Sequence, residues 1–331
     1  MQTMDEPAAG TVAERREWFR EVIDGLHADL ADLRDGATAD YIPELADVDP
    51  DRFAIAAETV DGQPIGVGDC DHPFTIQSVS KLLVYGLALQ THGRDRVLAR
   101  VGVAPTGDRF NAITLDGGRA PNPMVNAGAI AITDLVVGDD LDERVAALRE
   151  LYRRYLGRLP EIDHAVWESE RATGNRNRAI AYLMLSQGIV DDRVEETLDL
   201  YFAQCSVLVT AADLATIGAT LANHGVHPRS GEQVVSPAVA RDMLTIALTC
   251  GMYDYAGEWA FTVGIPAKSG VGGGILGMLP DIGGIATFAP RLDEYGNSVR
   301  GVRVFEALSA RFDLHLFDPD RPWVRDLGAT R

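Results

Sequence analysis

The distribution of apolar and polar residues along the chain indicates strands in some segments and helices in others. Near the start, two short apolar segments, 52–60 and 63–69, flank the pair Asp61-Gly62. An Asp-Gly pair between two such segments is typical of a tight β-hairpin, because both residues tolerate the backbone angles that the turn requires. We therefore predict an antiparallel hairpin here.

Longer apolar patterns indicate helices. Residues 1–35 have the character of a helical, acidic lead-in, and 75–89 form a segment rich in Leu, Val and Ala that we predict as a buried helix. Further along, 141–156 and 195–202 carry apolar residues at helical spacing. The middle third of the chain is therefore predicted to be mainly helical.

Two further helices are recognised by their first turns. The turn at 210–213 has the pattern of a capping box with Asp in place of the usual Glu, and Gly225 follows where the helix is expected to end. Ser236 before Pro237 is typical of an N-cap and a first helical position, and it opens a predicted helix to about residue 248. These signals place two helices before the strands predicted near the end of the chain.

The last third changes to short, apolar, glycine-rich segments, which we predict as strands. After them, Asn297 and Ser298 can start a final helix that runs to about Phe312. Helices that are separated in sequence from an antiparallel sheet are typical of the α+β class. The predicted strands are 259–265, 267–271, 274–279 and 284–289.

This order of elements predicts an α+β fold in which an antiparallel sheet is flanked by helices and carries an inserted all-helical subdomain. We place the lead-in at 1–35 and a single domain at 36–325. Within that domain, the sheet part is expected at about 36–100 and 226–315, and the helical part at about 101–225. No internal repeat or low-complexity linker divides the chain.

Composition and charge exclude several classes of protein. With 46% hydrophobic and 24% charged residues, the chain has an ordinary globular composition. No apolar segment reaches the roughly 18 residues needed to span a bilayer, so no membrane is expected as a partner. A net charge of −19 argues against nucleic acid, because phosphate binding needs clustered cations. The first ten residues lack the pattern of a signal peptide, so we expect a cytoplasmic protein.

The choice among charged residue types is uneven. The chain has 28 arginines but only two lysines, Lys81 and Lys268, and it has 32 Asp against 17 Glu. An acidic, lysine-poor surface suits a cytoplasm of high salt concentration, where net charge keeps a protein soluble. Codon usage in a GC-rich genome would also favour arginine, and the sequence alone leaves both explanations open.

Neither a metal nor a cofactor is indicated. The three cysteines, Cys70, Cys205 and Cys250, are widely spaced and form no CxxC pair, which argues against a disulfide framework and a cysteine zinc site. The seven histidines are scattered without carboxylates at ligand spacing. We therefore expect free thiols, no metal and no cofactor.

One candidate for catalysis is the segment Ser78-Val79-Ser80-Lys81. Ser78 and Lys81 are three residues apart, so a helix places both side chains on one face. A serine hydroxyl becomes a good nucleophile when a base accepts its proton; lysine can be that base once its pKa falls, whereas arginine cannot. In a chain that uses arginine almost everywhere, this lysine indicates serine acyl-transfer chemistry. The alternative is a helix start followed by an ordinary lysine.

The second candidate is Lys268-Ser269-Gly270, which contains the other lysine. A Lys-Ser/Thr-Gly triplet far downstream of Ser-x-x-Lys is the order found in penicillin-recognising serine enzymes. Glycines after the triplet let the backbone approach a ligand closely. The alternative is a glycine-rich turn between two strands.

Together with the segments between them, these motifs resemble the glutaminase family, whose catalytic domain is related to the serine β-lactamases and penicillin-binding proteins. The similarity runs from about Asp40 to Phe305. The resemblance implies a β-lactamase/transpeptidase-like fold, with 36–325 as the single catalytic domain. The matching segments include FTIQSVSK, PNPMVNAGAI, SERATGNRN, LDLYFAQCS, TCGMYDYAG and PAKSGVGGGILG.

The resemblance also implies an activity, the hydrolysis of the side-chain amide of L-glutamine to L-glutamate and ammonia. In that reaction Ser78 attacks the amide and becomes acylated, Lys81 takes the serine proton, and Tyr253 passes a proton to the departing ammonia. Backbone amides of Ser78 and Val271 would form the oxyanion hole. Relatives commonly form dimers or tetramers, which implies a homodimer or homotetramer here.

The family pattern further implies which residues bind glutamine. Glu170 would pair with the substrate ammonium, while amides and phenols would donate to its carboxylate. This sequence departs from the pattern at Asn175, where Asp is common, and at Gly273, where Ala is frequent; we expect the second change to loosen its loop. The implied substrate-binding residues are Tyr41, Gln77, Ser78, Asn126, Glu170, Asn177, Tyr201, Tyr253 and Val271.

Two other functions fit parts of this pattern. A penicillin-recognising hydrolase or transpeptidase shares both lysine motifs, but it should also carry a Ser-x-Asn motif between them and be exported; no clear motif of that kind and no signal peptide is found. A non-catalytic amino-acid sensor would keep the pocket without turnover, and the retention of both lysines argues against it.

Overall fold

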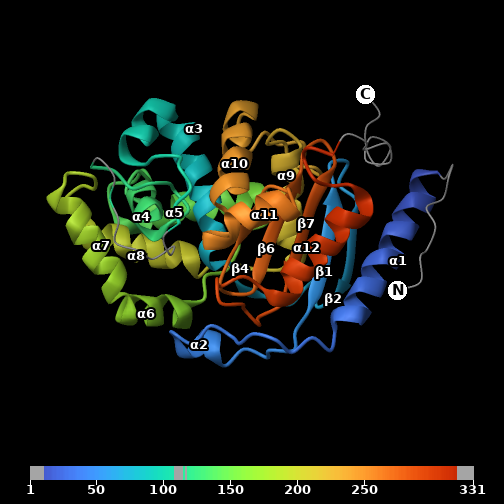
Figure 1. The fold of residues 1–331 in the computed structure, drawn as a ribbon. Coiled ribbons are helices and arrows are strands. Elements are labelled where there is room, and N and C mark those ends of the chain that lie inside the picture. Colours follow the sequence, from blue (N-terminus) through green and yellow to red (C-terminus); the bar gives the residue numbers. More distant parts are fainter. Residues whose placement is uncertain (1–10, 108–114, 116–117, 319–331) are drawn as a thin grey trace.

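The computed structural model describes residues 11–107, 115 and 118–318. Its centre is a five-stranded antiparallel sheet in the order β2-β1-β7-β6-β5 (Figure 1). The hairpin predicted around Asp61 and Gly62 is present, and β7 pairs with β1, so segments from both ends of the chain meet in one sheet. The strands are β1 (Ala54–Thr59), β2 (Pro64–Gly68), β5 (Ala267–Ser269), β6 (Gly274–Leu279) and β7 (Gly283–Phe288).

Side chains alternate across this sheet, and both of its faces are buried. In β1, Ala54 and Ala56 join the core that lies between the sheet and the helical part, while Ile55 and Ala57 join a second core on the other side. The alternation follows from the two-residue period of a strand. The sheet is therefore the middle layer between two layers of helices.

The second core is covered by the first and last helices. α1 (Val12–Leu30), α11 (Ala256–Thr262) and α12 (Val299–Phe312) supply its helical residues. The rings of Phe19 on α1 and Phe312 on α12 lie 5.6 Å apart. The helix predicted within the lead-in is thus packed against the rest of the molecule, beside β2 (Figure 1).

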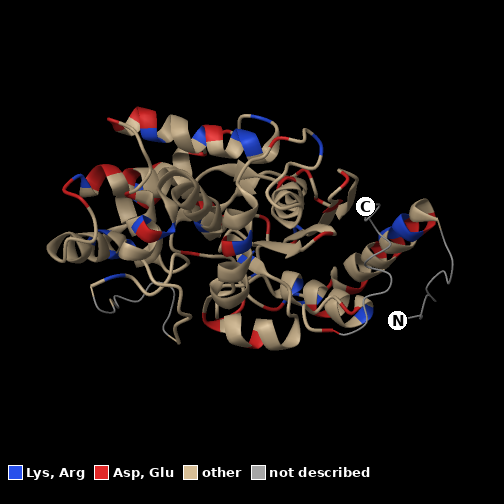
Figure 2. Cartoon of the chain, turned by 90° about the horizontal axis from the view of Figure 1, so that it is seen from above, with Lys and Arg blue, Asp and Glu red and all other residues tan. Residues whose placement is uncertain are grey.

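Acidic residues are spread over the outer helices and loops (Figure 2). Arginines pair with many of them; for example, Arg171 lies 2.6 Å from Asp199, and Arg229 lies 2.6 Å from Glu58. The two lysines behave differently, because Lys81 is 1% exposed and Lys268 is 0% exposed. Both lysines therefore lie inside the molecule, as do the two arginines Arg144 and Arg300.

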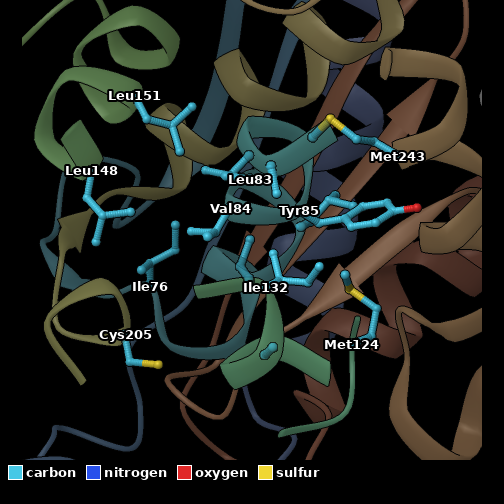
Figure 3. Packing of buried hydrophobic residues seen from close by; sticks show 14 of the residues in the cluster. Ile76, Leu83, Val84, Tyr85, Met124, Ile132, Leu148, Leu151, Cys205 and Met243 are labelled. Carbon is cyan, nitrogen blue, oxygen red and sulfur yellow. The ribbon is translucent and has the colours of Figure 1, made fainter. Parts of the chain in front are cut away.

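The other face of the sheet carries the helical part. α9 (Ala211–Ala222) lies directly on β6 and β7, and a Cβ at Gly218 would lie only 2.8 Å from the carbonyl oxygen of Gly277. Figure 3 shows side chains such as Leu83, Val84 and Ile132 filling the space between the helices. The remaining long helices are α3 (Ser80–Arg100), α4 (Asn126–Thr133), α5 (Leu141–Leu156), α6 (His164–Thr173), α7 (Asn175–Ser186), α8 (Val194–Cys205) and α10 (Pro237–Cys250).

Short elements connect the two parts. β3 (Phe74–Thr75) pairs with β4 (Leu208–Val209), and the 3-10 turn η1 (Gln77–Val79) leads from β3 into α3. A second 3-10 turn, η2 (Tyr253–Tyr255), follows α10, and α2 (Pro43–Ala46) precedes the sheet. None of the described helices is both long and apolar enough to cross a membrane.

The α+β class with an antiparallel sheet flanked by helices is confirmed. α5 has the predicted bounds, and α9 begins directly after Thr210, with the predicted capping box of Thr210 and Asp213 formed. Ser236 and Ser298 cap α10 and α12, each accepting a hydrogen bond from a backbone amide of the first turn. Local capping chemistry therefore located these helix starts correctly.

The prediction of a strand at 259–265 is wrong, because this segment forms most of α11 and the turn after it. Trp259 is fully buried and packs on Phe305, whereas Phe261, two residues later, is 85% exposed. This spacing suits a helix, and the packing of Trp259 overrides the strand preference of Trp, Phe and Val. Gly264, with φ +63°, then ends the helix.

Two predicted boundaries also differ from the structure. The helix predicted at 75–89 begins at Ser80 instead, because the residues before it form β3 and η1, and it continues to Arg100 across a break at Gly93. The strand predicted at 267–271 ends at Ser269, because the Gly270 amide donates to the carbonyl of Gly274 and closes a turn.

Candidate active site

A cavity of about 300 Å³ lies where the helical part meets the loop after β5. Eight of the nine residues predicted to bind glutamine line it, and they come from seven separate segments of the chain. Folding therefore gathers at one place residues that are up to 230 positions apart, from Tyr41 to Val271. The eight residues are Tyr41, Gln77, Ser78, Asn126, Glu170, Asn177, Tyr201 and Val271.

Ser78 is held at the cavity by the 3-10 turn η1. The preceding residue, Gln77, has φ +47°, a left-handed conformation that is uncommon for residues other than glycine. Its side chain is buried, and its Nε2 donates to Thr75 Oγ1 at 3.2 Å. η1 continues directly into α3, and residues three apart lie on one side of either kind of helix, so Ser78 and Lys81 are expected to share a side.

The loop after β5 is pressed against this turn. A Cβ at Gly270 would lie 2.9 Å from the carbonyl oxygen of Ile76, and one at Gly272 would lie 2.5 Å from that of Thr75. Only glycine allows such a close approach of two backbones. The two glycines thereby bring Val271, which stands between them, to the cavity beside Ser78.

At Gly273 the structure gives a reason for the departure from the family pattern. This residue has φ +95°, and a Cβ there would lie 2.6 Å from the carbonyl oxygen of Ala289. Alanine would be strained at this position, whereas glycine is not. Gly273 therefore fits a tight turn, and the expected loosening of the loop has no support in this geometry.

Lys81 is buried beneath the cavity. Its Nζ donates to Asn126 Oδ1 at 2.6 Å and to the carbonyl oxygen of Met124 at 3.2 Å. Burial lowers the pKa of Lys81 to about 8, against the opposing influence of Cys205 and Glu170. With that pKa, about a tenth of the molecules carry a neutral amine at pH 7, and a neutral amine can accept a proton.

Tyr253 is a neighbour of Ser78 in the folded chain. It begins η2 with φ +55°, and it also borders a second cavity of about 20 Å³. Burial raises the pKa of Tyr253 well above its usual range, while hydrogen bonding with the Ser78 side chain and the Val271 backbone opposes this rise. The structure thus brings Tyr253 into contact with Ser78, although Tyr253 is not part of the wall of the larger cavity.

At the other end of the cavity a carboxylate is available for a cation. The hydroxyl of Tyr41 donates to Glu170 Oε1 at 2.8 Å and lies 3.2 Å from Gln77 Oε1. Burial raises the pKa of Glu170, and hydrogen bonding with Tyr41 and Gln77 together with the charge of Lys81 acts in the other direction. This buried carboxylate is suited to bind an ammonium group.

Amides and phenols line the rest of the cavity. Asn126 joins two parts of the site, because its Oδ1 accepts from Lys81 and its Nδ2 donates to Asn177 Oδ1 at 2.9 Å. Tyr201 is buried on α8, and burial raises its pKa well above the usual range, so its hydroxyl keeps its proton. These groups can donate hydrogen bonds to a carboxylate.

Four further residues line the cavity that the sequence did not single out. Thr173 ends α6, Gly174 separates α6 from α7, Arg176 is the second residue of α7, and Cys205 ends α8. The first three lie inside the motif that contains Glu170 and Asn177, so their closeness in sequence to these predicted residues could have indicated them. For Cys205, only its place in the motif LDLYFAQCS could have indicated a position at the site.

Neither a metal site nor a disulfide is formed by the part of the chain that is described. No group of three His, Cys, Asp or Glu side chains there is arranged to hold a metal ion. Cys70, Cys205 and Cys250 are free thiols.

Comparison with known proteins identifies relatives along nearly the whole chain. The family model described as Glutaminase matches residues 36–317. A glutaminase of Nostoc sp. is 54% identical over 316 residues, which are 95% of either chain. A glutaminase of Corynebacterium efficiens is 46% identical over 308 residues, covering 92% of this chain and 72% of the relative.

Solved structures agree with this result. The probable glutaminase ybaS has a TM-score of 0.88 at 38% identity, with 91% of this chain and 98% of that chain covered. A Bacillus glutaminase studied in the presence of 4.3 M NaCl has a TM-score of 0.82 at 34% identity, covering 91% of this chain and 99% of that one. The similarity includes both the sheet and the helical part.

Proposed function

The chain belongs to the glutaminase family, and from this premise we propose that it hydrolyses L-glutamine to L-glutamate and ammonia through an acyl-enzyme on Ser78. The observation that carries the assignment of Ser78 is its place on the wall of a cavity that also holds a buried carboxylate, three residues before a buried amine. Lys81 supplies the amine and Glu170 the carboxylate.

In the first half of the reaction, Ser78 Oγ attacks the carbon of the side-chain amide. Lys81 takes the hydroxyl proton as the new C–O bond forms. The C–N bond then breaks, Tyr253 gives its phenolic proton to the leaving nitrogen, and Lys81 returns a proton to Tyr253. In the second half, water attacks the ester, glutamate leaves, and Ser78 recovers its proton. The protonation states of the enzyme are the same before and after the cycle.

Charge that develops on the carbonyl oxygen needs hydrogen-bond donors. We assign this role to the backbone amides of Ser78 and Val271. The close approach of Gly270 and Gly272, on either side of Val271, to the segment just before Ser78 supports the assignment. Removing one such donor typically costs about 3 kcal/mol of transition-state stabilisation. The two glycines beside Val271 are thus important for the reaction although neither carries a side chain.

Recognition of glutamine uses both ends of the cavity. Glu170 pairs with the α-ammonium group, and Tyr41 and Gln77 hold that carboxylate in place. Asn126, Asn177 and Tyr201 donate to the α-carboxylate. A simple amide would leave these buried polar groups without partners, and for that reason the site rejects it.

The environment and assembly of the protein are part of the same proposal. We place it in the cytoplasm as a homodimer or homotetramer.

The activity is tested by incubating the purified chain with L-glutamine and measuring ammonia and glutamate. Ser78→Ala should abolish both products, because it removes the nucleophile. Ser80→Ala is the matched control: Ser80 is a buried serine two residues away that is absent from the cavity wall, so this variant should keep most of the activity. Equal turnover by wild type and Ser78→Ala would refute the assignment of the nucleophile.

The same preparation separates the other two functions. Hydrolysis of a chromogenic β-lactam without release of ammonia from glutamine would indicate a penicillin-recognising enzyme. Tight binding of glutamine without turnover, measured by calorimetry, would indicate an amino-acid sensor. Either result would overturn the proposed reaction.

A further inference from the structure

Lys268 has no part in the reaction described above, yet it is the only other lysine in the chain. It lies on β5 and is 0% exposed. A buried ammonium group is costly unless hydrogen-bond acceptors surround it. The environment of Lys268 therefore indicates what the amine does there.

Three acceptors surround the Lys268 amine. Its Nζ lies 2.5 Å from the carbonyl oxygen of Ser269 and 3.0 Å from that of Gly251, and it lies 4.4 Å from the centre of the Tyr253 ring. An ammonium group has three N–H bonds, and the face of an aromatic ring attracts a cation. The position thus matches a protonated amine in number and kind of partners.

These contacts join the segment that carries Tyr253 to the strand that leads to Val271. Gly251 follows α10 directly, two residues before Tyr253, and a Cβ there would lie only 1.7 Å from the carbonyl oxygen of Ala267. Tyr253 itself has φ +55°, which costs on the order of 1 kcal/mol for a residue other than glycine. A conformation of this kind persists only when neighbouring contacts hold it.

We propose that Lys268 is a positioning residue for the reaction, whose ammonium group holds the Tyr253 ring beside Ser78 and stabilises the phenol when its proton leaves. This inference rests on the proposed function, in which Tyr253 protonates the departing ammonia. Loss of the phenolic proton makes the ring more negative, so its attraction to the cation grows at that moment. Lys268 keeps all of its own protons throughout, and no other reactant is needed.

The charge of Lys268 also affects Lys81. Burial, and in addition the charge of Lys81, lowers the pKa of Lys268. Repulsion between two cations is mutual, so a charge that is kept on Lys268 by its two carbonyl partners favours the neutral form of Lys81. The neutral form is the one that accepts the Ser78 proton.

A double-mutant cycle between Lys268 and Tyr253 tests the inference. Lys268→Met keeps the length of the side chain and removes its charge, and it should lower kcat roughly tenfold to a hundredfold while KM for glutamine changes less than about threefold. In a Tyr253→Phe background, where there is no phenolic proton to transfer, the same substitution should lower kcat less than about threefold. The residual rates are measured as ammonia release per folded enzyme.

Controls distinguish this effect from a loss of stability. Arg300→Met removes another buried cation, on α12, that contacts carbonyl oxygens, Asp51 and the Phe53 ring and lies outside the cavity wall; it should lower the unfolding temperature but leave kcat per folded enzyme unchanged in both backgrounds. If Lys268→Met does not fold, Lys268→Arg serves in the same cycle, because it keeps a charge but displaces it from the ring.

The results of these measurements distinguish a failure of the inference about Lys268 from a failure of the proposed function. Equal, additive losses in both backgrounds would show a purely structural role and overturn the inference. An unchanged kcat in Lys268→Met would overturn it as well. A wild-type chain that releases no ammonia would instead refute the proposed function itself.

Discussion

At the scale of single residues, the chemistry of the site depends on how far each polar group is removed from water. Lys81 and Glu170 are both buried, and burial moves the pKa of the amine down and that of the carboxyl group up. The sequence already indicated Lys81, because a lysine stands three residues from a serine in a chain that otherwise uses arginine. It could not indicate the acceptor Asn126, 45 positions further along, because that contact exists only in the folded chain.

The pKa of Lys81 predicts the pH dependence of the reaction. A lysine acts as a base only after losing its proton, so kcat/KM for glutamine should rise with pH along an acid limb centred near 8, falling about tenfold for each unit below it. The charged and titratable groups that interact electrostatically with this amine include Glu170, Cys205 and Lys268. The measurement is kcat/KM for ammonia release across a series of buffers.

Lys81→Arg gives the corresponding variant. A guanidinium group stays protonated at every pH of the series, so this variant should be nearly as inactive as Lys81→Ala. Substantial activity in the arginine variant would rule out Lys81 as the base.

At the scale of elements, sequence patterns succeeded where a local signal decided the structure. Capping residues marked the starts of α9, α10 and α12, and the Asp-Gly pair marked the hairpin. Patterns failed where packing decided: α11 is a helix because Trp259 is buried against Phe305. The polar segment that contains Glu170 and Asn177 forms the end of α6 and the start of α7. Its few apolar residues give no helical pattern, and contacts with neighbouring helices hold it in place.

α1 offers a prediction at this scale. Ile23 is 0% exposed and packs in the core that α1 shares with the sheet and α12. Ile23→Ala should therefore lower the free energy of unfolding by about 2–5 kcal/mol, because it leaves a cavity. The value is measured by urea unfolding, and kcat should not change, since no residue of α1 lines the active-site cavity.

Glu21→Ala is the matched control on the same helix. Glu21 is exposed, so its replacement should change stability by less than about 0.5 kcal/mol. A loss of similar size in both variants would mean that the helix is sensitive at any position and that burial of Ile23 is not the cause.

At the scale of the whole molecule, the order of elements was sufficient to predict the α+β class, because a hairpin, a helical block and a set of late strands permit few compact arrangements. The pairing of β1 with β7 was beyond the reach of sequence patterns, because it joins segments more than 220 residues apart. The positions of Tyr41 and Val271 on one cavity depend on that long-range arrangement. Only the family resemblance indicated them beforehand.

Net charge makes a prediction for the whole molecule. With a formal charge of −19, repulsion between surface carboxylates opposes folding, and salt screens it. The unfolding temperature should therefore rise by a few degrees between about 0.05 and 0.5 M NaCl, and an equal ionic strength of choline chloride should have the same effect. Differential scanning calorimetry measures both series.

The same experiment decides between the two explanations of the acidic composition. A chain that is folded and active without added salt, with a rise that levels off below about 1 M, does not need a salt-rich environment. A chain that unfolds without molar salt is adapted to one. The absence of any rise would contradict the repulsion argument.

The burial of both lysines has a practical consequence for chemical labelling. Reagents that acylate primary amines find no lysine at the surface of this protein, because Lys81 and Lys268 are both enclosed. Coupling to a dye or resin through lysine would therefore select molecules whose active-site region has opened. The rate at which such a reagent modifies Lys81 and Lys268 therefore measures how often this region opens. The measurement is made at the two residues to which we assign roles in turnover.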